Sequence, residues 1–120
     1  MLNLDTHILI SILNDDLSPR EYDLVLKNEL VISDVVLWEL AKLVQLGRLS
    51  MNLDGPEFRQ CLRQISILPI TPEIARTSTR LDFSSDPADE IIAATSIVED
   101  IPLLTRDHRI LKSRIVPFAK

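Results

Sequence analysis

The sequence of 120 residues is poor in cysteine, glycine and aromatic residues, and each shortage excludes a class of protein. Its one cysteine, Cys61, rules out an internal disulfide and any zinc cluster built on cysteines. Two glycines leave little room for long flexible linkers, and an aromatic share of 4% argues against binding single-stranded nucleic acid by stacking. No apolar run, such as that at 35–38, approaches the length needed to span a bilayer.

Aliphatic residues, in contrast, are abundant. Hydrophobic residues make up 46% of the chain, which predicts a compact core of Leu, Ile and Val. We expect a single domain over residues 1–120, since a chain of this length can bury a core without disulfides. The N-terminus lacks the basic segment and cleavage site of a signal peptide. Together with the lone cysteine, this predicts a cytoplasmic protein that does not interact with membranes.

The net charge of −5 is unfavourable for a protein that binds nucleic acid, because phosphates are bound mainly by lysine and arginine. The charges are unevenly distributed, however. Residues 81–105 contain six acids and no basic residue, whereas residues 106–120 contain five basic residues and one acid. An acidic centre beside a basic rim is typical of a metal-dependent nuclease, although about half of these residues could be ordinary solvated charges on helices.

Short apolar runs alternate with helical signals along the whole chain. We expect strands at 1–4, 30–32, 66–70, 102–105 and 114–118. Helices are expected at 7–13, from 19, at 35–46, after the turn at 54–56 to about 64, from 72, at 87–98 and at 107–111. Such alternation predicts an α/β fold, a three-layer α/β/α sandwich with a short parallel sheet between helices.

Four acids recur where an apolar run gives way to a helix or within the helix that follows: Asp5, Glu39, Asp89 and Asp107. In an open α/β sheet the ends where strands pass into helices meet at one crevice. Two carboxylates about 5 Å apart repel by about 3 kcal/mol at an effective dielectric constant of about 20. We therefore expect a divalent cation among them, and oxygen ligands favour Mg²⁺ or Mn²⁺ over zinc. Phosphodiester cleavage is the chemistry that such a site favours.

Glu39 is the most informative of the four, because it lies in a helix that is apolar almost all round and should be buried on most sides. An ion pair with Lys42, three residues on, is the ordinary explanation, but an exposed pair of this kind contributes only a few tenths of a kcal/mol. A charge in so apolar a helix should instead be paired or act as a ligand.

The other three acids also have ordinary explanations. Asp5 and Asp107 could cap the helices that follow them. Asp89 could belong to a capping box, although we expect Asp86 to be the cap and Asp89 to carry the chemistry. On the same helix face, Ala93 and Ser96 are small enough to let the helix approach the sheet closely.

Other catalytic arrangements find no support. His7 and His108 are the only histidines, and neither has a cysteine to share a metal with. No Ser-His-Asp order and no phosphate-binding P-loop motif is present.

Several motifs in order resemble the PIN domains, specifically the VapC-type ribonuclease toxins of toxin–antitoxin systems. The similarity covers nearly the whole chain. It is carried by the segments 5–7, 38–41 with Ser33, 46–49, 68–71, 86–89 with 92–94, and 103–107.

This resemblance implies an Mg²⁺- or Mn²⁺-dependent endoribonuclease. Asp5, Glu39 and Asp89 match the three family acids, and Asp107 matches a fourth, more variable one. Thr6 and Thr105 match hydroxyl positions beside the pocket. The family normally forms homodimers and is silenced by a small antitoxin, here a VapB-like partner, that lies across the active-site groove.

The sequence departs from the family pattern around these acids. Family members often carry an aromatic residue where Ala88 stands, arginine where Glu90 stands and a bulky residue where Ser11 stands. Losing a basic residue makes the rim less attractive to RNA. The remaining candidates for binding RNA phosphates are Arg48, Arg106, Arg109 and Lys112.

Two other readings remain open. A phospho-accepting receiver domain has a similar size, and Asp54 could imitate its acceptor. Asp5 lacks the second acid that such a domain needs beside it, and Arg106 stands where a lysine is required. The second reading is a PIN-fold protein that binds RNA or a partner without cutting it.

Overall fold

A short parallel sheet organises the fold of the computed structural model, which describes residues 1–120. Its strands are β1 (Leu2–Leu4), β2 (Leu30–Ser33), β3 (Ile65–Leu68) and β4 (Leu103–Leu104), in the order β3-β2-β1-β4. Leu2 of β1 pairs with Leu30 of β2, and Leu4 pairs with Leu104 of β4. Since all pairs are parallel, the strands pass into their following segments at one end of the sheet.

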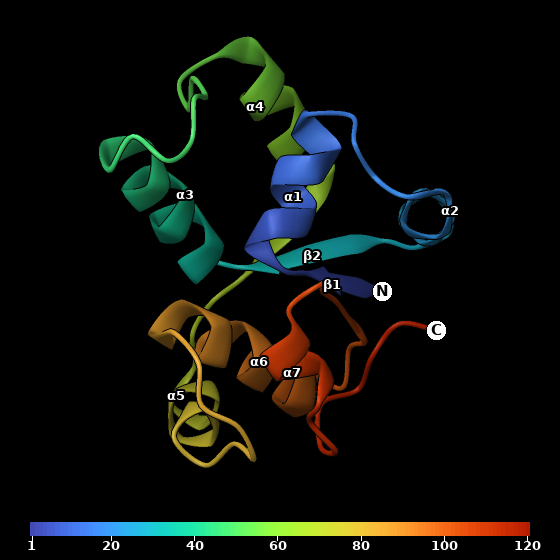
Figure 1. Cartoon of the computed structure of the whole chain (residues 1–120), viewed down its shortest axis with the longest axis vertical. Helices are drawn as coiled ribbons and strands as arrows, with labels where there is room; N and C mark the ends of the chain where they lie inside the picture. Colours follow the sequence, from blue (N-terminus) through green and yellow to red (C-terminus); the bar gives the residue numbers. More distant parts are fainter.

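Helices cover both faces of this sheet, which Figure 1 shows nearly edge-on. On one side lie α1 (Thr6–Leu13), α3 (Val35–Gln45) and α4 (Pro56–Leu62), with α2 (Pro19–Lys27) beside them. On the other side lie α5 (Pro72–Ser78), α6 (Pro87–Glu99) and α7 (His108–Leu111). None of these helices combines the length and the apolar character that crossing a bilayer requires. The arrangement confirms the three-layer α/β/α fold expected from the sequence.

Close contact between α6 and the sheet follows from small side chains. Ala93 and Ser96 are completely buried. The amide group of Asn3, in the central strand β1, donates hydrogen bonds to the Ser96 hydroxyl at 2.9 Å and to the Ile92 carbonyl at 3.2 Å. The prediction that small residues let this helix approach the sheet is therefore confirmed.

Helix starts largely follow the expected capping chemistry. The hydroxyls of Ser18 and Thr71 accept hydrogen bonds from backbone N–H groups in the first turns of α2 and α5. Ahead of α3 the Ser33 hydroxyl accepts from the Val35 N–H, while Asp34, at the N-cap, makes no capping hydrogen bond.

The strand expected at 114–118 is wrong. Only a single bridge, between Leu103 and Phe118, continues the sheet beyond β4. Pro117 has no N–H to donate to a ladder. The Ser113 hydroxyl accepts from the N–H groups of Ile115 and Val116 and so holds the segment in a turn.

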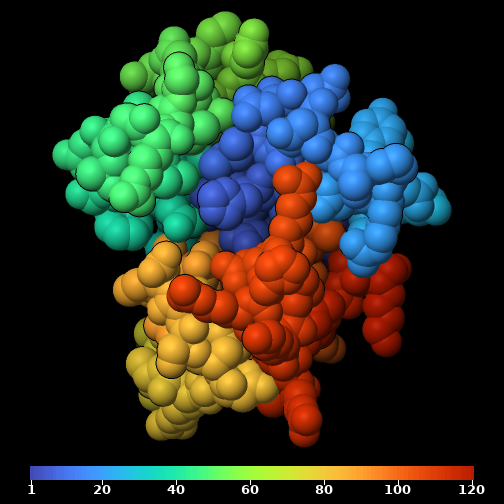
Figure 2. Space-filling view, in the orientation of Figure 1, coloured from blue at the N-terminus to red at the C-terminus, as the bar shows by residue number.

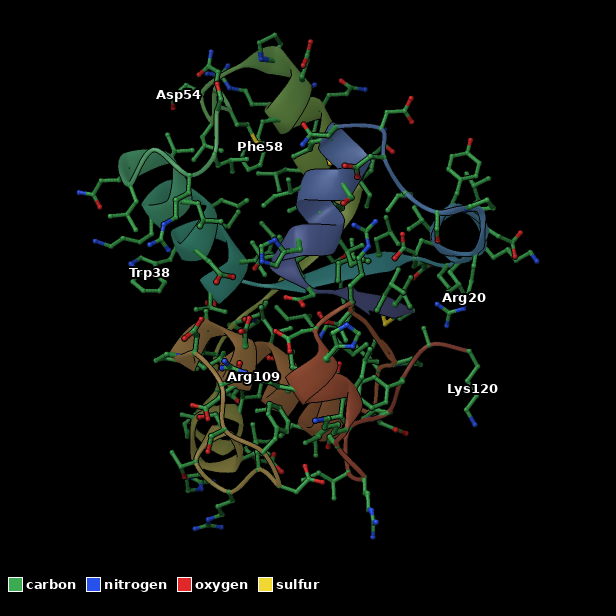
Figure 3. All side chains as sticks on the ribbon, in the orientation of Figure 1. Arg20, Trp38, Asp54, Phe58, Arg109 and Lys120 are labelled. Atoms are coloured by element: carbon green, nitrogen blue, oxygen red, sulfur yellow. The ribbon has the colours of Figure 1, made fainter.

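The expectation that α3 is buried on most sides is also wrong for the single chain. Val35, Val36 and Leu40 enter the core, but Trp38 is 56% exposed and Leu46, directly after the helix, is 61% exposed. The Trp38 side chain points outward from α3 (Figure 3). The apolar composition of α3 therefore predicted more burial of this helix than the rest of the single chain provides.

Candidate active site

The four candidate acids come from four separate segments near the carboxyl ends of the strands. Asp5 follows β1 and is the N-cap of α1, and Asp107 lies just beyond β4 as the N-cap of α7. Glu39 lies on α3 and Asp89 lies in the first turn of α6. Helices from both sides of the sheet thus supply acids to the site (Figure 1).

Asp5 is the most constrained acid, with only 2% of its surface exposed. One carboxylate oxygen accepts from the Thr6 N–H at 2.8 Å, and the other accepts from the Thr105 hydroxyl at 2.6 Å. Burial raises the pKa of Asp5, and the hydrogen bonds from Thr105 and Thr6 oppose that rise. Asp5 caps its helix, as the ordinary explanation held, and still faces the other acids.

Glu39 does not form the ion pair offered as its ordinary explanation. Its carboxylate accepts a hydrogen bond from the Thr6 hydroxyl. Lys42 donates instead to the side-chain oxygen of Gln45 at 3.1 Å. Thr6 therefore links two of the candidate acids, because its N–H binds Asp5 and its hydroxyl binds Glu39.

The pKa of Asp89 responds to the charges of the other three candidate acids. Its pKa is raised to about 6, first by burial and next by the negative charge of Asp5. A hydrogen bond from the Ser85 hydroxyl at 3.0 Å lowers the pKa, whereas the charges of Glu39 and Asp107 raise it further. One carboxyl group is therefore within electrostatic reach of the other three.

Asp107 caps α7, as its ordinary explanation predicted. One carboxylate oxygen accepts from the N–H groups of Arg109 at 2.8 Å and Ile110 at 3.3 Å, and its own N–H donates to the Thr105 hydroxyl at 3.0 Å. A pocket of about 300 Å³ opens beside it, and its lining comes from α1 and the segment after β4: Asp5, His7, Ile10, Ser11, Arg106 and Asp107. In Figure 2 these two segments, blue and orange-red, lie side by side at the surface.

These acids do not form a ready-made metal cage. No group of three or more His, Cys, Asp or Glu side chains lies close enough together to hold a metal ion. Three of the carboxylates are instead bound by hydroxyl groups: Asp5 by Thr105, Glu39 by Thr6 and Asp89 by Ser85. The donor set nevertheless fits a hard cation, because it is all oxygen. The negative charges of Asp5, Glu39 and Asp107 add to burial in raising the pKa of Asp89, and a cation would offset them.

The auxiliary and RNA-binding candidates lie at several places around the acids. Asp86 occupies the N-cap position of α6, as expected, but its side chain makes no capping hydrogen bond. Arg109 and Lys112 are exposed on and after α7, and Arg48 is exposed beyond α3. Arg106 forms a salt bridge with Glu21 that the sequence analysis did not foresee.

Two residues near the site escaped the sequence analysis. Ser85, which binds Asp89, follows no recognisable pattern. Glu21 was detectable, because Ser18 and Glu21 have the spacing of a capping box, and the structure contains both of its hydrogen bonds.

Comparison with known proteins gives a consistent result. Residues 3–114 match the family described as PIN domain. Ribonuclease VapC22 of Mycobacterium tuberculosis is 32% identical over 90 residues, which cover 72% of this chain and 69% of that protein. Among solved structures, the VapBC2 complex of Rickettsia felis bound to a promoter DNA fragment matches with a TM-score of 0.76 at 20% identity, over 99% of this chain and 98% of that one.

FitAcB from Neisseria gonorrhoeae gives a TM-score of 0.75 at 21% identity, over 99% of this chain and 97% of that one. A toxin–antitoxin complex from Klebsiella pneumoniae gives 0.72 at 22% identity, with the same coverage. At these identities the solved structures establish the fold, while the sequence matches establish kinship. The chain belongs to the PIN domain family and, within it, to the VapC-type ribonucleases.

Proposed function

We propose that this protein is a metal-dependent endoribonuclease that hydrolyses RNA phosphodiester bonds and acts as the toxin of a toxin–antitoxin pair. The observation that carries the proposal is the electrostatic coupling of Asp89 to Asp5, Glu39 and Asp107 at one end of a parallel sheet. A cluster of acids with a raised pKa is a frequent mark of a functional site. Kinship with a VapC ribonuclease supports RNA as the substrate.

The metal would be Mg²⁺ or Mn²⁺, held by Asp5, Glu39, Asp89 and Asp107. When bound there, such an ion would supply the activation of a water molecule and the neutralisation of charge on the phosphate that hydrolysis requires. The protein's own task is to orient the carboxylates. Thr105 holds Asp5 through a 2.6 Å hydrogen bond, and Thr6 holds Glu39. Asp86, exposed at the start of α6, is an auxiliary candidate only.

RNA would approach over α7. Arg109 and Lys112 are exposed there, close in sequence to Asp107, and Figure 3 shows the Arg109 side chain extending from this helix. Arg48 could contact a more distant phosphate. Arg106 directs its Nε and Nη2 groups at Glu21, so we expect it to contribute less to RNA binding than Arg109.

We also propose two protein partners, a VapB-like antitoxin and a second copy of this chain. The solved structures of similar fold include toxin–antitoxin complexes, which supports an antitoxin partner. The exposed side chains of Trp38 and Leu46 on and after α3 offer apolar surface for such a contact. The proposed place of action is the cytoplasm, in line with the single cysteine and the absence of a membrane-spanning helix.

The proposal is tested by incubating defined RNA with purified protein and Mg²⁺ or Mn²⁺, with EDTA as the blank. Wild-type protein should cleave only with the metal, and Asp5→Asn should not cleave. Equal cleavage by both proteins would reveal a contaminant or a wrong site assignment.

A silent PIN-fold binding module is the second candidate, and two observations favour it. The acids do not already form a metal cage, and Glu90 adds a further negative charge beside Asp89. If the wild type binds Mn²⁺ and RNA but leaves RNA intact, this second candidate replaces the first.

A further inference from the structure

An ion pair ties α2 to the segment between two of the site residues. Arg106 lies between Thr105 and Asp107, and its Nε and Nη2 donate to the two carboxylate oxygens of Glu21 at 2.8 and 2.7 Å. A two-point contact of this kind fixes the orientation of the guanidinium plane as well as its position. Nη2 also reaches the Asp16 carbonyl at 3.4 Å.

Glu21 is itself firmly placed. It is only 6% exposed and belongs to a capping box, in which its carboxylate accepts from the Ser18 N–H at 2.8 Å and its own N–H donates to the Ser18 hydroxyl at 3.2 Å. The hydrogen bonds from Arg106 lead in lowering the pKa of Glu21 to about 2, so its charge persists at any physiological pH. The start of α2 therefore offers Arg106 a fixed anionic anchor.

The segment that Arg106 belongs to has little rigidity of its own. β4 has two residues and α7 has four, and elements this short depend on their contacts for stability. The Thr105 hydroxyl nevertheless has to meet Asp5 while accepting from the Asp107 N–H. A small movement of this segment would break both hydrogen bonds at the same time.

We propose that Glu21 and Arg106 are positioning residues, whose ion pair holds residues 105–107 so that Thr105 orients Asp5 and Asp107 faces the acid cluster. This inference rests on the proposed site, in which those acids bind the metal. Outer groups that orient metal ligands typically change affinity or activity about 10- to 100-fold when they are removed. Glu21 and Arg106 do not touch the acids themselves. They act through Thr105, which neighbours Arg106 in sequence and binds Asp5.

The key variants are Glu21→Gln, which keeps the shape but removes the charge, and Arg106→Lys, which keeps a cation but loses the two-point contact. Asp23→Asn is the matched control, because it breaks the exposed pair with Lys27, 2.8 Å apart, on the same helix. Thermal melting establishes that each variant is folded. Arg106→Lys leaves the capping box intact and so covers the case in which Glu21→Gln does not fold.

Three measurements are made on each protein: Mn²⁺ binding by calorimetry, amide hydrogen exchange at residues 105–110, and steady-state RNA cleavage. For Glu21→Gln we expect Mn²⁺ affinity to fall about 10-fold, kcat to fall about 10- to 100-fold with KM little changed, and the amides of Asp107 and Arg109 to exchange faster. Arg106→Lys should lie between this variant and the wild type, and Asp23→Asn should match the wild type.

The outcomes separate this inference from the proposed function. Absence of Mn²⁺ binding by the wild type, or full activity of Asp5→Asn, would overturn the site assignment itself. If the wild type and Asp5→Asn behave as proposed while Glu21→Gln keeps normal Mn²⁺ affinity and exchange, the positioning role is refuted. A raised KM with unchanged kcat and Mn²⁺ affinity in Arg106→Lys would also refute it, by assigning Arg106 to RNA contact.

Discussion

Asp5 and Asp89 belong to the same group of acids but are carried by different elements: Asp5 lies at the end of a strand and Asp89 lies on a helix. Asp5 is almost completely buried and both of its oxygens accept hydrogen bonds, from Thr6 and Thr105. Asp89 has a single side-chain hydrogen bond, from Ser85, and its pKa is raised to about 6 by burial first and by the charge of Asp5 next. Hydrogen bonds therefore hold the strand-end acid more firmly than the helix acid, and we expect a bound cation to matter most for relieving the charge around Asp89.

The largest expected effect comes from removing either carboxylate. Asp5→Asn and Asp89→Asn should each reduce RNA cleavage by more than the roughly 100-fold limit typical of outer residues, because both are proposed metal ligands. Glu39→Gln should do the same. Asp54→Asn, in an exposed turn, is the control and should remain fully active. Near-normal cleavage by any of the three variants would remove that residue from the catalytic set.

Removing the hydroxyl that binds each acid should affect RNA cleavage more at Asp5 than at Asp89. Thr105→Val should lower kcat about 10- to 100-fold, because Asp5 loses a hydrogen bond in a buried setting. Ser85→Ala should have a smaller effect, since Asp89 is more exposed and less constrained. Thr105→Ser keeps the hydroxyl and serves as the control; if it is as impaired as Thr105→Val, the loss is one of packing and not of hydrogen bonding.

Metal addition should stabilise the wild type through the same acids. Without metal the cluster repels itself, so saturating Mn²⁺ should raise Tm, and an excess of 100 times Kd would correspond to about 2.7 kcal/mol. The rise should be much smaller for Asp89→Asn than for Asp54→Asn, as measured by thermal melting at neutral pH. Equal rises in both variants would mean that the stabilising ion binds elsewhere.

The raised pKa of Asp89 also predicts how stability depends on pH in EDTA. Between its ordinary value of 3.8 and about 6, the folded state binds more protons than the unfolded state, so Asp89 makes stability fall as pH rises through this range. Asp89→Asn should therefore be more stable than the wild type at pH 8 by about 1 kcal/mol, less than the shift alone implies because the side chain is partly exposed.

The difference should be much smaller at pH 4 and vanish well below the ordinary pKa of 3.8, where the carboxyl is protonated in both the folded and the unfolded state. Urea denaturation at pH 4 and pH 8 provides the measurement. A gain in stability that is equal at both pH values would point to a packing effect of the asparagine instead.

The smallest effects are expected on the basic rim. Arg109→Ala and Lys112→Ala should each reduce the slope of log K against log salt by nearly one unit, as loss of one phosphate contact predicts. RNA binding would be measured with Asp5→Asn as the background, so that RNA stays intact. Arg63→Ala, at the C-cap of α4, is the control for lost charge. An unchanged slope would exclude the mutated residue from phosphate binding.

Local patterns predicted most of the elements correctly, and the failures have identifiable causes. The proline-led helices at Pro19, Pro72 and Pro87 were predicted because the signals for a helix start lie within a few residues. The expected strand at 114–118 failed because Pro117 and the Ser113 turn prevent a ladder. Burial of α3 was overestimated because composition does not specify how much of a helix its own chain can cover.

The candidate acids were also visible in the sequence, but the groups that hold them were not. Asp5, Asp89 and Asp107 stand beside predicted helix starts, and Glu39 stands out in an apolar helix. Their partners lie far away along the chain, as with Thr6 and Glu39, 33 residues apart. No periodicity or capping rule relates residues at such distances.

The order of apolar runs, caps and acids in this chain was sufficient to specify an α/β sandwich with carboxylates at the ends of its strands, because hydrophobic period and capping act over one or two turns. Only the tertiary structure decided which hydroxyl meets which acid, that Arg106 pairs with Glu21, and that the pKa values of Asp5 and Asp89 are raised. Hydrogen bonds and desolvation depend on distances of a few ångströms between segments that only folding brings together.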